Sequence, residues 1–207
     1  MSEQIRLAVI YYSATGNVHR LATSAAEGGE KAGADVRLRK VKELAPASAI
    51  AANPDWAWHV ESTRDVEEAD VEDLKWADAV LFGTPTRYGA MASQLKQFID
   101  ITGPVWEKGL LADKVYGAFG SAGTAHGGHE STLLSLHNVF YHWGGIIVPP
   151  GYTDPIQFQL GNPYGTSHVG GSGAPDGPVI EGVRYQATRA TETAARLKAG
   201  VAALATL

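Results

Sequence analysis

Hydrophobic and polar positions follow two kinds of pattern along the chain. Near-continuous apolar runs of β-forming residues occupy 5–12, 78–84, 114–120 and 145–148. Such runs are typical of strands buried on both faces of a parallel sheet. Residues 36–41 instead alternate apolar and basic side chains with a period of two, which indicates a strand near the sheet edge with one solvated face. The pattern therefore predicts five strands.

Segments whose apolar residues have helical spacing lie between these strands and after the last one. Apolar residues recur every three or four positions after Asn17, again over 91–99 and 133–140, and finally over 183–204, which predicts a closing amphipathic helix. Residues from about 46 to 73 break this rhythm, so we expect an irregular connection with short helices there. Strands and helices thus alternate through most of the chain.

This alternation predicts a single α/β domain over residues 1–207, with a doubly wound five-stranded parallel sheet and helices on both faces. The flavodoxin-like order 2-1-3-4-5 is the simplest arrangement. Residues 149–178 are rich in proline and glycine, so we expect a long loop there within the domain. In this fold, ligands lie beyond the C-terminal ends of the strands, at the switch between strands one and three.

Composition narrows the classes of partner. The formal net charge is −5 and no run of Lys and Arg is present, which argues against nucleic acid as a ligand. The chain has no cysteine, which excludes disulfides and thiolate metal sites and favours a cytoplasmic protein; we expect no metal. The longest apolar runs fall far short of the roughly 20 residues that span a bilayer, so no membrane span is expected.

The loop after the first strand has the composition of an anion site. Small hydroxylated residues and one glycine let several N–H groups point inward at a helix N-terminus, where a terminal phosphate monoester fits. In the alternative interpretation, Ser13 and Thr15 only cap the helix. Neither a nucleoside triphosphate loop nor a G-x-G-x-x-G turn follows this strand. The candidate residues are Ser13, Ala14, Thr15, Gly16, Asn17 and Val18.

Two further loops are predicted at the same edge of the sheet. In the first, a proline stiffens a turn that offers hydrogen-bond donors and an aromatic ring, as a flavin requires, although a plain turn with a solvated arginine is the alternative. In the second, glycines let backbone amides reach a flat ligand, although such turns often only provide flexibility. The candidates are Pro85, Thr86, Arg87 and Tyr88, then Ser121, Ala122, Gly123, Thr124, Gly127 and Gly128.

Six segments in this order resemble the WrbA family of NAD(P)H:quinone oxidoreductases over nearly the whole chain: YYSATGNV, FGTPTRYGAM, TGPVWEKGLL, FGSAGTAHGG, YHWGGIIVPPGY and GNPYG. The resemblance implies a flavodoxin-like fold, FMN as cofactor and a homotetramer. By position, residues 13–18 would hold the FMN phosphate, and residues 86–88 and 121–128 would border the isoalloxazine. His142 would complete the flavin site, and Trp106 would be the aromatic residue of the substrate pocket.

The same resemblance implies a ping-pong reaction, in which NADH or NADPH gives two electrons that then pass to a quinone. The sequence differs from the family at two places that concern the binding of the nicotinamide nucleotide. Thr15, also a candidate substrate residue, stands where relatives often carry an aromatic, and the third loop is one residue longer, with His126 inserted. His126, His129 and His142 are candidate proton donors, His142 being the only catalytic candidate that the resemblance supports.

Several alternatives stay open. A one-electron flavodoxin-type carrier and an FMN-binding interaction protein are the two rivals to the enzyme. A serine hydrolase is excluded, because no G-x-S-x-G turn follows a strand. Trp56 and Trp58 are expected to cover the underside of the irregular connection or to form a subunit contact rather than to bind substrate.

Overall fold

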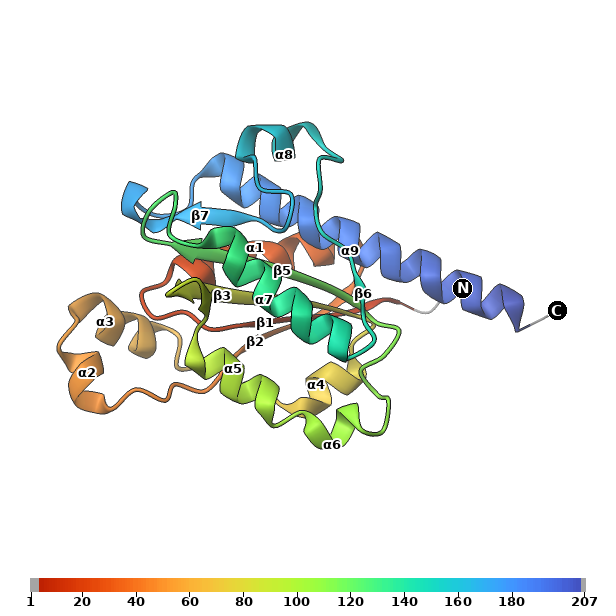
Figure 1. Ribbon diagram of the computed structural model, residues 1–207, viewed down its shortest axis with the longest axis horizontal. Coiled ribbons are helices and arrows are strands. Elements are labelled where there is room, and N and C mark those ends of the chain that lie inside the picture. Colours follow the sequence, from red (N-terminus) through yellow and green to blue (C-terminus); the bar gives the residue numbers. More distant parts are fainter. Residues whose placement is uncertain (1–3, 206–207) are drawn as a thin grey trace.

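The computed structural model describes residues 4–205. Its central sheet runs in the order β2-β1-β3-β5-β6, and every neighbouring pair on this path is parallel (Figure 1). These strands coincide with the five predicted, four from apolar runs and one from the alternating pattern at 36–41. Their bounds are Arg6–Tyr11 for β1, Asp35–Lys40 for β2, Ala79–Arg87 for β3, Val115–Ala122 for β5 and Ile146–Ile147 for β6.

The sheet has seven strands among the described residues, so the prediction of five is too low. β4 (Ala90–Met91) pairs antiparallel with β3 across a turn in which Tyr88 and Gly89 both have positive φ. β7 (Ser167–Val169) pairs parallel with β5. Strands this short carry no readable periodicity, and their existence depends on the partner strand rather than on local sequence.

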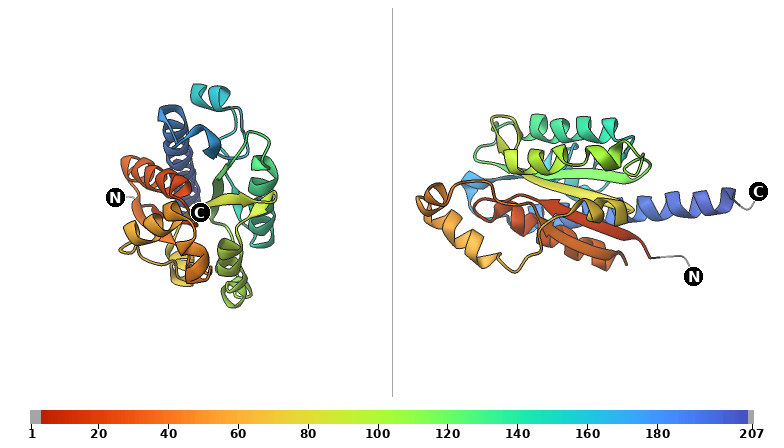
Figure 2. Two further views of the ribbon diagram at one scale, coloured as in Figure 1. Left: turned by 90° about the vertical axis from the view of Figure 1, so that its left-hand side faces the viewer. Right: turned by 90° about the horizontal axis from the view of Figure 1, so that it is seen from below.

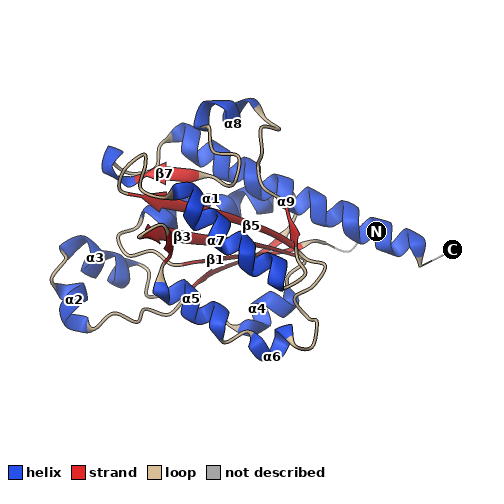
Figure 3. Ribbon diagram, viewed as in Figure 1, coloured by secondary structure: helices blue, strands red, loops and turns tan. Residues whose placement is uncertain are grey.

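Helices cover both faces of the sheet (Figures 2 and 3). α1 (Asn17–Lys31) and α9 (Gly177–Leu204) cover one face. α4 (Val71–Trp76), α5 (Ser93–Asp100) and α7 (His129–His142) pack on the other. The predicted irregular connection holds α2 (Ala47–Ala51), α3 (Pro54–Ser62) and α4, and α6 (Gly103–Trp106) follows α5. Among residues 4–205, no helix combines the length and the apolar character needed to cross a membrane.

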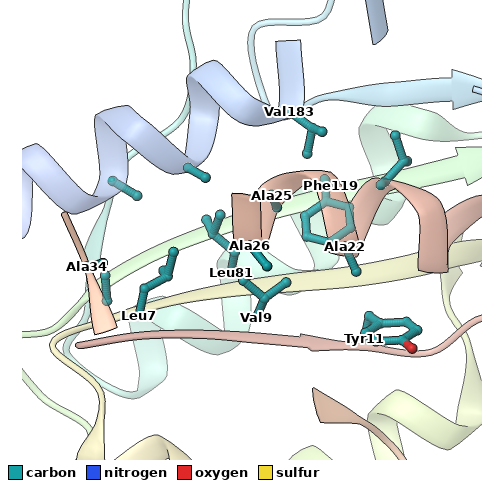
Figure 4. Packing of buried hydrophobic residues seen from close by; sticks show 14 of the residues in the cluster. Leu7, Val9, Tyr11, Ala22, Ala25, Ala26, Ala34, Leu81, Phe119 and Val183 are labelled. Atoms are coloured by element: carbon teal, nitrogen blue, oxygen red, sulfur yellow. The ribbon is translucent and has the colours of Figure 1, made fainter. Parts of the chain in front are cut away.

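Alternate residues of β1 build the two halves of the core. Leu7, Val9 and Tyr11 face α1 and α9 (Figure 4). Ala8 and Ile10 face the opposite layer. All five are nearly or fully buried. Because both faces of the strand are covered, its sequence is a continuous apolar run rather than an alternating one. This packing fixes the strand ends, and therefore the loops that leave them.

The segment 149–178 is not one long loop. It holds α8 (Pro155–Leu160), β7 and a 3-10 turn, η1 (Gly170–Ser172). Pro155 stands in the first turn of α8, where a missing N–H costs nothing, and Asp154 caps the helix. The proline content that suggests a loop therefore partly marks a helix start.

Candidate functional site

A cleft of about 490 Å³ lies at the C-terminal ends of β1, β3 and β5. In Figure 1 the strand arrows point toward this end of the molecule, where α2 and α3 also lie. The cleft brings together residues from all three predicted loops and from two segments that no motif indicated. It is lined by Ser13, Ala14, Thr15, Asn17, Val18, Asn53, Trp56, Pro85, Thr86, Arg87, Ser121, Ala122, Gly123, Gly170 and Gly171.

The first loop leads into α1 through Gly16, the N-cap residue, whose φ of 98° lies in the left-handed region. The Gly16 N–H donates to Ser13 Oγ over 3.1 Å, so the Ser13 hydroxyl closes the loop itself. Among the residues that the structure describes, no side chain caps α1, and the first turn of this helix contains no acidic residue. The interpretation of Ser13 and Thr15 as caps is therefore wrong. The N–H groups at the start of α1 remain available for an anion beside the cleft.

The second loop contributes three of its four candidates to the cleft, Pro85, Thr86 and Arg87. The Thr86 hydroxyl turns toward α7, where it donates to the Gly128 carbonyl and contacts the Thr132 hydroxyl. Tyr88 does not border the cleft and its side chain is fully exposed. The Arg87 side chain borders the cleft and lies along the loop, donating to the Thr86 carbonyl over 3.0 Å.

The third loop divides into two parts. Ser121, Ala122 and Gly123 border the cleft, whereas the other candidates, Thr124, Gly127 and Gly128, do not. Gly128 has a φ of 88°, and a Cβ there would lie 2.8 Å from Cα of Gly89. The glycine therefore allows the second and third loops to touch. The insertion His126 is exposed within this turn.

His142 and Trp106 are not brought to the cleft of their own chain. α7 begins at His129 near the cleft and has 14 residues, so His142 lies about 20 Å farther along its axis. The indole Nε1 of Trp106 donates to the backbone carbonyl of His142 over 2.8 Å, so the two residues are neighbours. Figure 1 shows α6 and the end of α7 away from the strand tips.

Four cleft residues were missed by sequence reasoning: Asn53, Trp56, Gly170 and Gly171. A Cβ on Gly171 would lie 2.5 Å from the Gly123 carbonyl oxygen, so only glycine allows this close approach. The adjacent glycines 170 and 171 were a usable signal within the 149–178 segment. Asn53 and Trp56 gave none, since they lie in a connection without periodicity.

Residues 5–156 match the protein family described as NADPH-dependent FMN reductase. The chain belongs to this family. A protein of Deinococcus radiodurans named NAD(P)H dehydrogenase (quinone) is 43% identical over 202 residues, covering 95% of this chain and 99% of that protein. A protein of the same name from Rhodopseudomonas palustris is 40% identical over 200 residues, covering 93% of this chain and 98% of that protein.

Solved structures agree with this family assignment at the level of the fold. A WrbA-like flavodoxin from Agrobacterium tumefaciens has a TM-score of 0.65 at 24% identity, covering 93% of this chain and 99% of that chain. A flavodoxin from the domain Archaea has a TM-score of 0.61 at 18% identity, covering 92% and 99%. These structures confirm the flavodoxin-like α/β fold. Taken with the family match and the named relatives, they also confirm the predicted resemblance to the WrbA family of NAD(P)H:quinone oxidoreductases.

Two histidines lie behind the first loop of this FMN reductase family member. His59 is buried, forms a hydrogen bond with the backbone of Ser13, and has its ring centroid 5.4 Å from that of His19. His19 Nδ1 in turn lies 2.6 Å from the Tyr11 hydroxyl. Burial lowers the pKa of His59 to about 4, and His19, when it is protonated, and Lys40 act in the same direction. Burial, followed by the charge of Lys40, also lowers the pKa of His19. Both rings are therefore neutral at pH 7.

This burial predicts acid sensitivity. Because the folded-state pKa of His59 is lowered from 6.5, the unfolded chain takes up a proton first as the pH falls. Stability conferred by the neutral ring is present above pH 6.5 and is lost toward pH 4, amounting to about 3 kcal/mol. His59→Gln should flatten this part of the pH profile of unfolding free energy, measured in urea. His126→Gln, at an exposed site, should not. A difference between wild type and His59→Gln that is the same at every pH would contradict the assignment.

Proposed function

We propose that this chain is an FMN-dependent oxidoreductase that passes two electrons from NAD(P)H to quinones. The cleft at the C-terminal ends of β1, β3 and β5 carries the proposal, because it combines an uncapped helix start with close-approaching backbone from two glycine-containing segments. Its volume, about 490 Å³, lies within the usual range of small-molecule sites. Relatives that match nearly the whole chain carry the name NAD(P)H dehydrogenase (quinone).

The residues of the cleft fit FMN in two places. Residues 13–18 would hold the phosphate, since the start of α1 offers N–H groups with no competing side-chain cap and no acidic residue. A Cβ on Gly171 would clash with the Gly123 carbonyl oxygen, so both positions present only backbone to the cleft. Such backbone can face the edge of a flat ring. Pro85, Thr86 and Arg87 would border the ring from β3.

When bound, FMN supplies a group that takes up two electrons and gives them to a second substrate. The Arg87 guanidinium places a positive charge at the cleft, where it would stabilise the negative charge that reduction brings. A nucleotide and a quinone that each pack on the ring where Pro85–Arg87 and Ser121–Gly123 border it would use that position in turn. That arrangement supports a ping-pong reaction.

The three candidate proton donors do not border the cleft. His129 is buried with Nε2 against the Thr124 carbonyl, 3.1 Å away, and His142 lies at the far end of α7. We therefore propose that the hydroquinone oxygens take their protons from water in the open cleft. The sequence contains no run of Lys and Arg, and we therefore propose that nucleic acid is not a partner. It also contains no cysteine, which favours a cytoplasmic enzyme.

Trp106 and His142 support the homotetramer that the family resemblance implies. The indole is half exposed and cannot reach the cleft of its own chain, so a role at the substrate pocket requires the cleft of a neighbouring copy. Trp106→Ala should raise the quinone KM roughly three- to tenfold while leaving FMN bound, because it removes an aromatic wall. Flavin absorbance and steady-state kinetics of the purified variant check this. Loss of flavin would show that Trp106 holds the cofactor instead.

Steady-state kinetics test the proposed function against its rivals. With FMN-loaded protein, varying NADH or NADPH at several fixed quinone concentrations should give parallel double-reciprocal lines, as a ping-pong reaction does. A one-electron carrier or an interaction protein would show no turnover. Intersecting lines would agree with an oxidoreductase but would contradict the proposal that nucleotide and quinone use the same position in turn.

A further inference from the structure

Trp56 stands between two hollows of the surface. It borders the cleft and also an adjacent, largely apolar pocket of about 690 Å³, which lies against the β3–β4 hairpin, α5 and α7. Arg87 is the other residue that both hollows share. The indole is therefore a wall shared by the two hollows, together with Arg87 of the loop that would border the flavin ring.

Hydrogen bonds hold this indole in place. Its Nε1 donates to Glu43 Oε2 over 3.0 Å, and its backbone N–H donates to the Asn53 side chain over 3.2 Å. Glu43 is itself fixed, accepting from the Tyr12 hydroxyl at 2.9 Å and from Gln94 Nε2 at 2.8 Å. The ring is thus preorganised through Glu43 by Tyr12, which follows β1, and by Gln94 of α5, and little entropy is lost when a ligand packs on it.

A comparison within the same helix shows that this position is specific. Trp58, two residues later on α3, is 69% exposed and borders neither hollow. If both tryptophans only covered the underside of the connection, as the sequence suggested, their surroundings would be expected to be similar. Only Trp56 combines a hydrogen-bonded indole with a place beside the open position of the cleft.

We propose that Trp56 is a substrate-binding residue, the aromatic wall against which the nicotinamide and quinone rings pack in turn. The inference rests on the proposed function, because it requires planar substrates at one shared position. A fixed indole offers such rings a large apolar face, and its helix segment bonds to Glu43 and Asn53 rather than to the residues proposed to hold the phosphate. Trp56 would therefore affect the binding of both substrates and not the retention of FMN.

The test compares Trp56→Ala with Trp58→Ala in the FMN-loaded protein. For Trp56→Ala we expect the KM values of NAD(P)H and quinone each to rise roughly three- to tenfold, with kcat and the FMN dissociation constant within about twofold of wild type. Trp58→Ala should leave all four quantities unchanged. Trp56→Phe should recover most of the loss, and Glu43→Gln should raise both KM values less than Trp56→Ala does.

Each contrary result has a distinct meaning. Weakened FMN binding with unchanged KM values would overturn the inference and place the indole on the cofactor. Unchanged KM values for Trp56→Ala in an active enzyme would overturn the inference alone. A rise confined to one substrate would reject the shared wall. Wild-type protein that binds FMN but reduces no quinone would reject the proposed function, on which the inference depends.

Discussion

Gly16→Asp should lower the affinity for FMN at least about a hundredfold. The new carboxylate would lie at the start of α1, where the phosphate is proposed to bind, and two negative charges about 4 Å apart repel by several kcal/mol at a protein surface. The φ of 98° adds strain, since residues with a Cβ rarely adopt it. Quenching of flavin fluorescence during titration of the FMN-free protein measures the affinity.

Gly33→Asp is the matched control. Gly33 has a φ of 86°, so the backbone strain is similar, and a Cβ there meets nothing within 4 Å. It follows the opposite end of the same helix, far from the cleft. This variant should bind FMN like wild type while losing a similar amount of stability. Wild-type affinity in Gly16→Asp would refute the phosphate assignment.

Gln186→Leu should cost about 3 kcal/mol of unfolding free energy, a large part of the stability of an ordinary domain. The Gln186 side chain is fully buried on α9. Its Nε2 donates to the Ala118 carbonyl over 2.8 Å, and its Oε1 accepts from the Thr166 N–H over 2.9 Å. Leucine would leave two buried backbone groups without these partners.

The same substitution should also loosen the cleft, because Thr166 precedes β7 and the Gly170–Ser172 turn that borders it. Urea unfolding measures the stability, with a lower midpoint and an unchanged slope expected. Gln97→Leu, at an exposed position on α5, should change the midpoint little. Equal midpoints for the two variants would show that the buried amide is not structurally important.

The sequence predicted the buried sheet because each long strand is covered on both faces. Residues 5–12 and 78–84 are near-continuous apolar runs rich in β-forming residues, and short runs of this kind flanked by turn residues favour buried strands. β4 and β7 were not predictable, since two or three residues become a strand only when a partner lies beside them. The helix in the 149–178 segment was not predicted, because the proline in its first turn was interpreted as a sign of a loop.

In the candidate site too, some residues could be predicted from local sequence and others depend on tertiary packing. Residues 13–18 and 85–87 were predictable because parallel strands place their C-terminal loops at one edge. Trp56 was not, because only tertiary packing brings α3 to that edge. The adjacent glycines 170 and 171 could be noticed in the sequence, but their place at this edge also depends on tertiary packing. For Trp106 and His142, the family resemblance supplied a role without showing which copy of the chain would use it.

Anaerobic titration of the FMN-loaded protein tests the central claim most directly. One equivalent of NADH or NADPH should remove the flavin absorbance near the visible maximum, and one equivalent of quinone should then restore it fully. Gly16→Asp, carried through the same FMN-loading step, should show neither change. Flavin absorbance in the loaded protein that does not respond to either nucleotide, or that is lost but not restored by quinone, would contradict an NAD(P)H:quinone oxidoreductase.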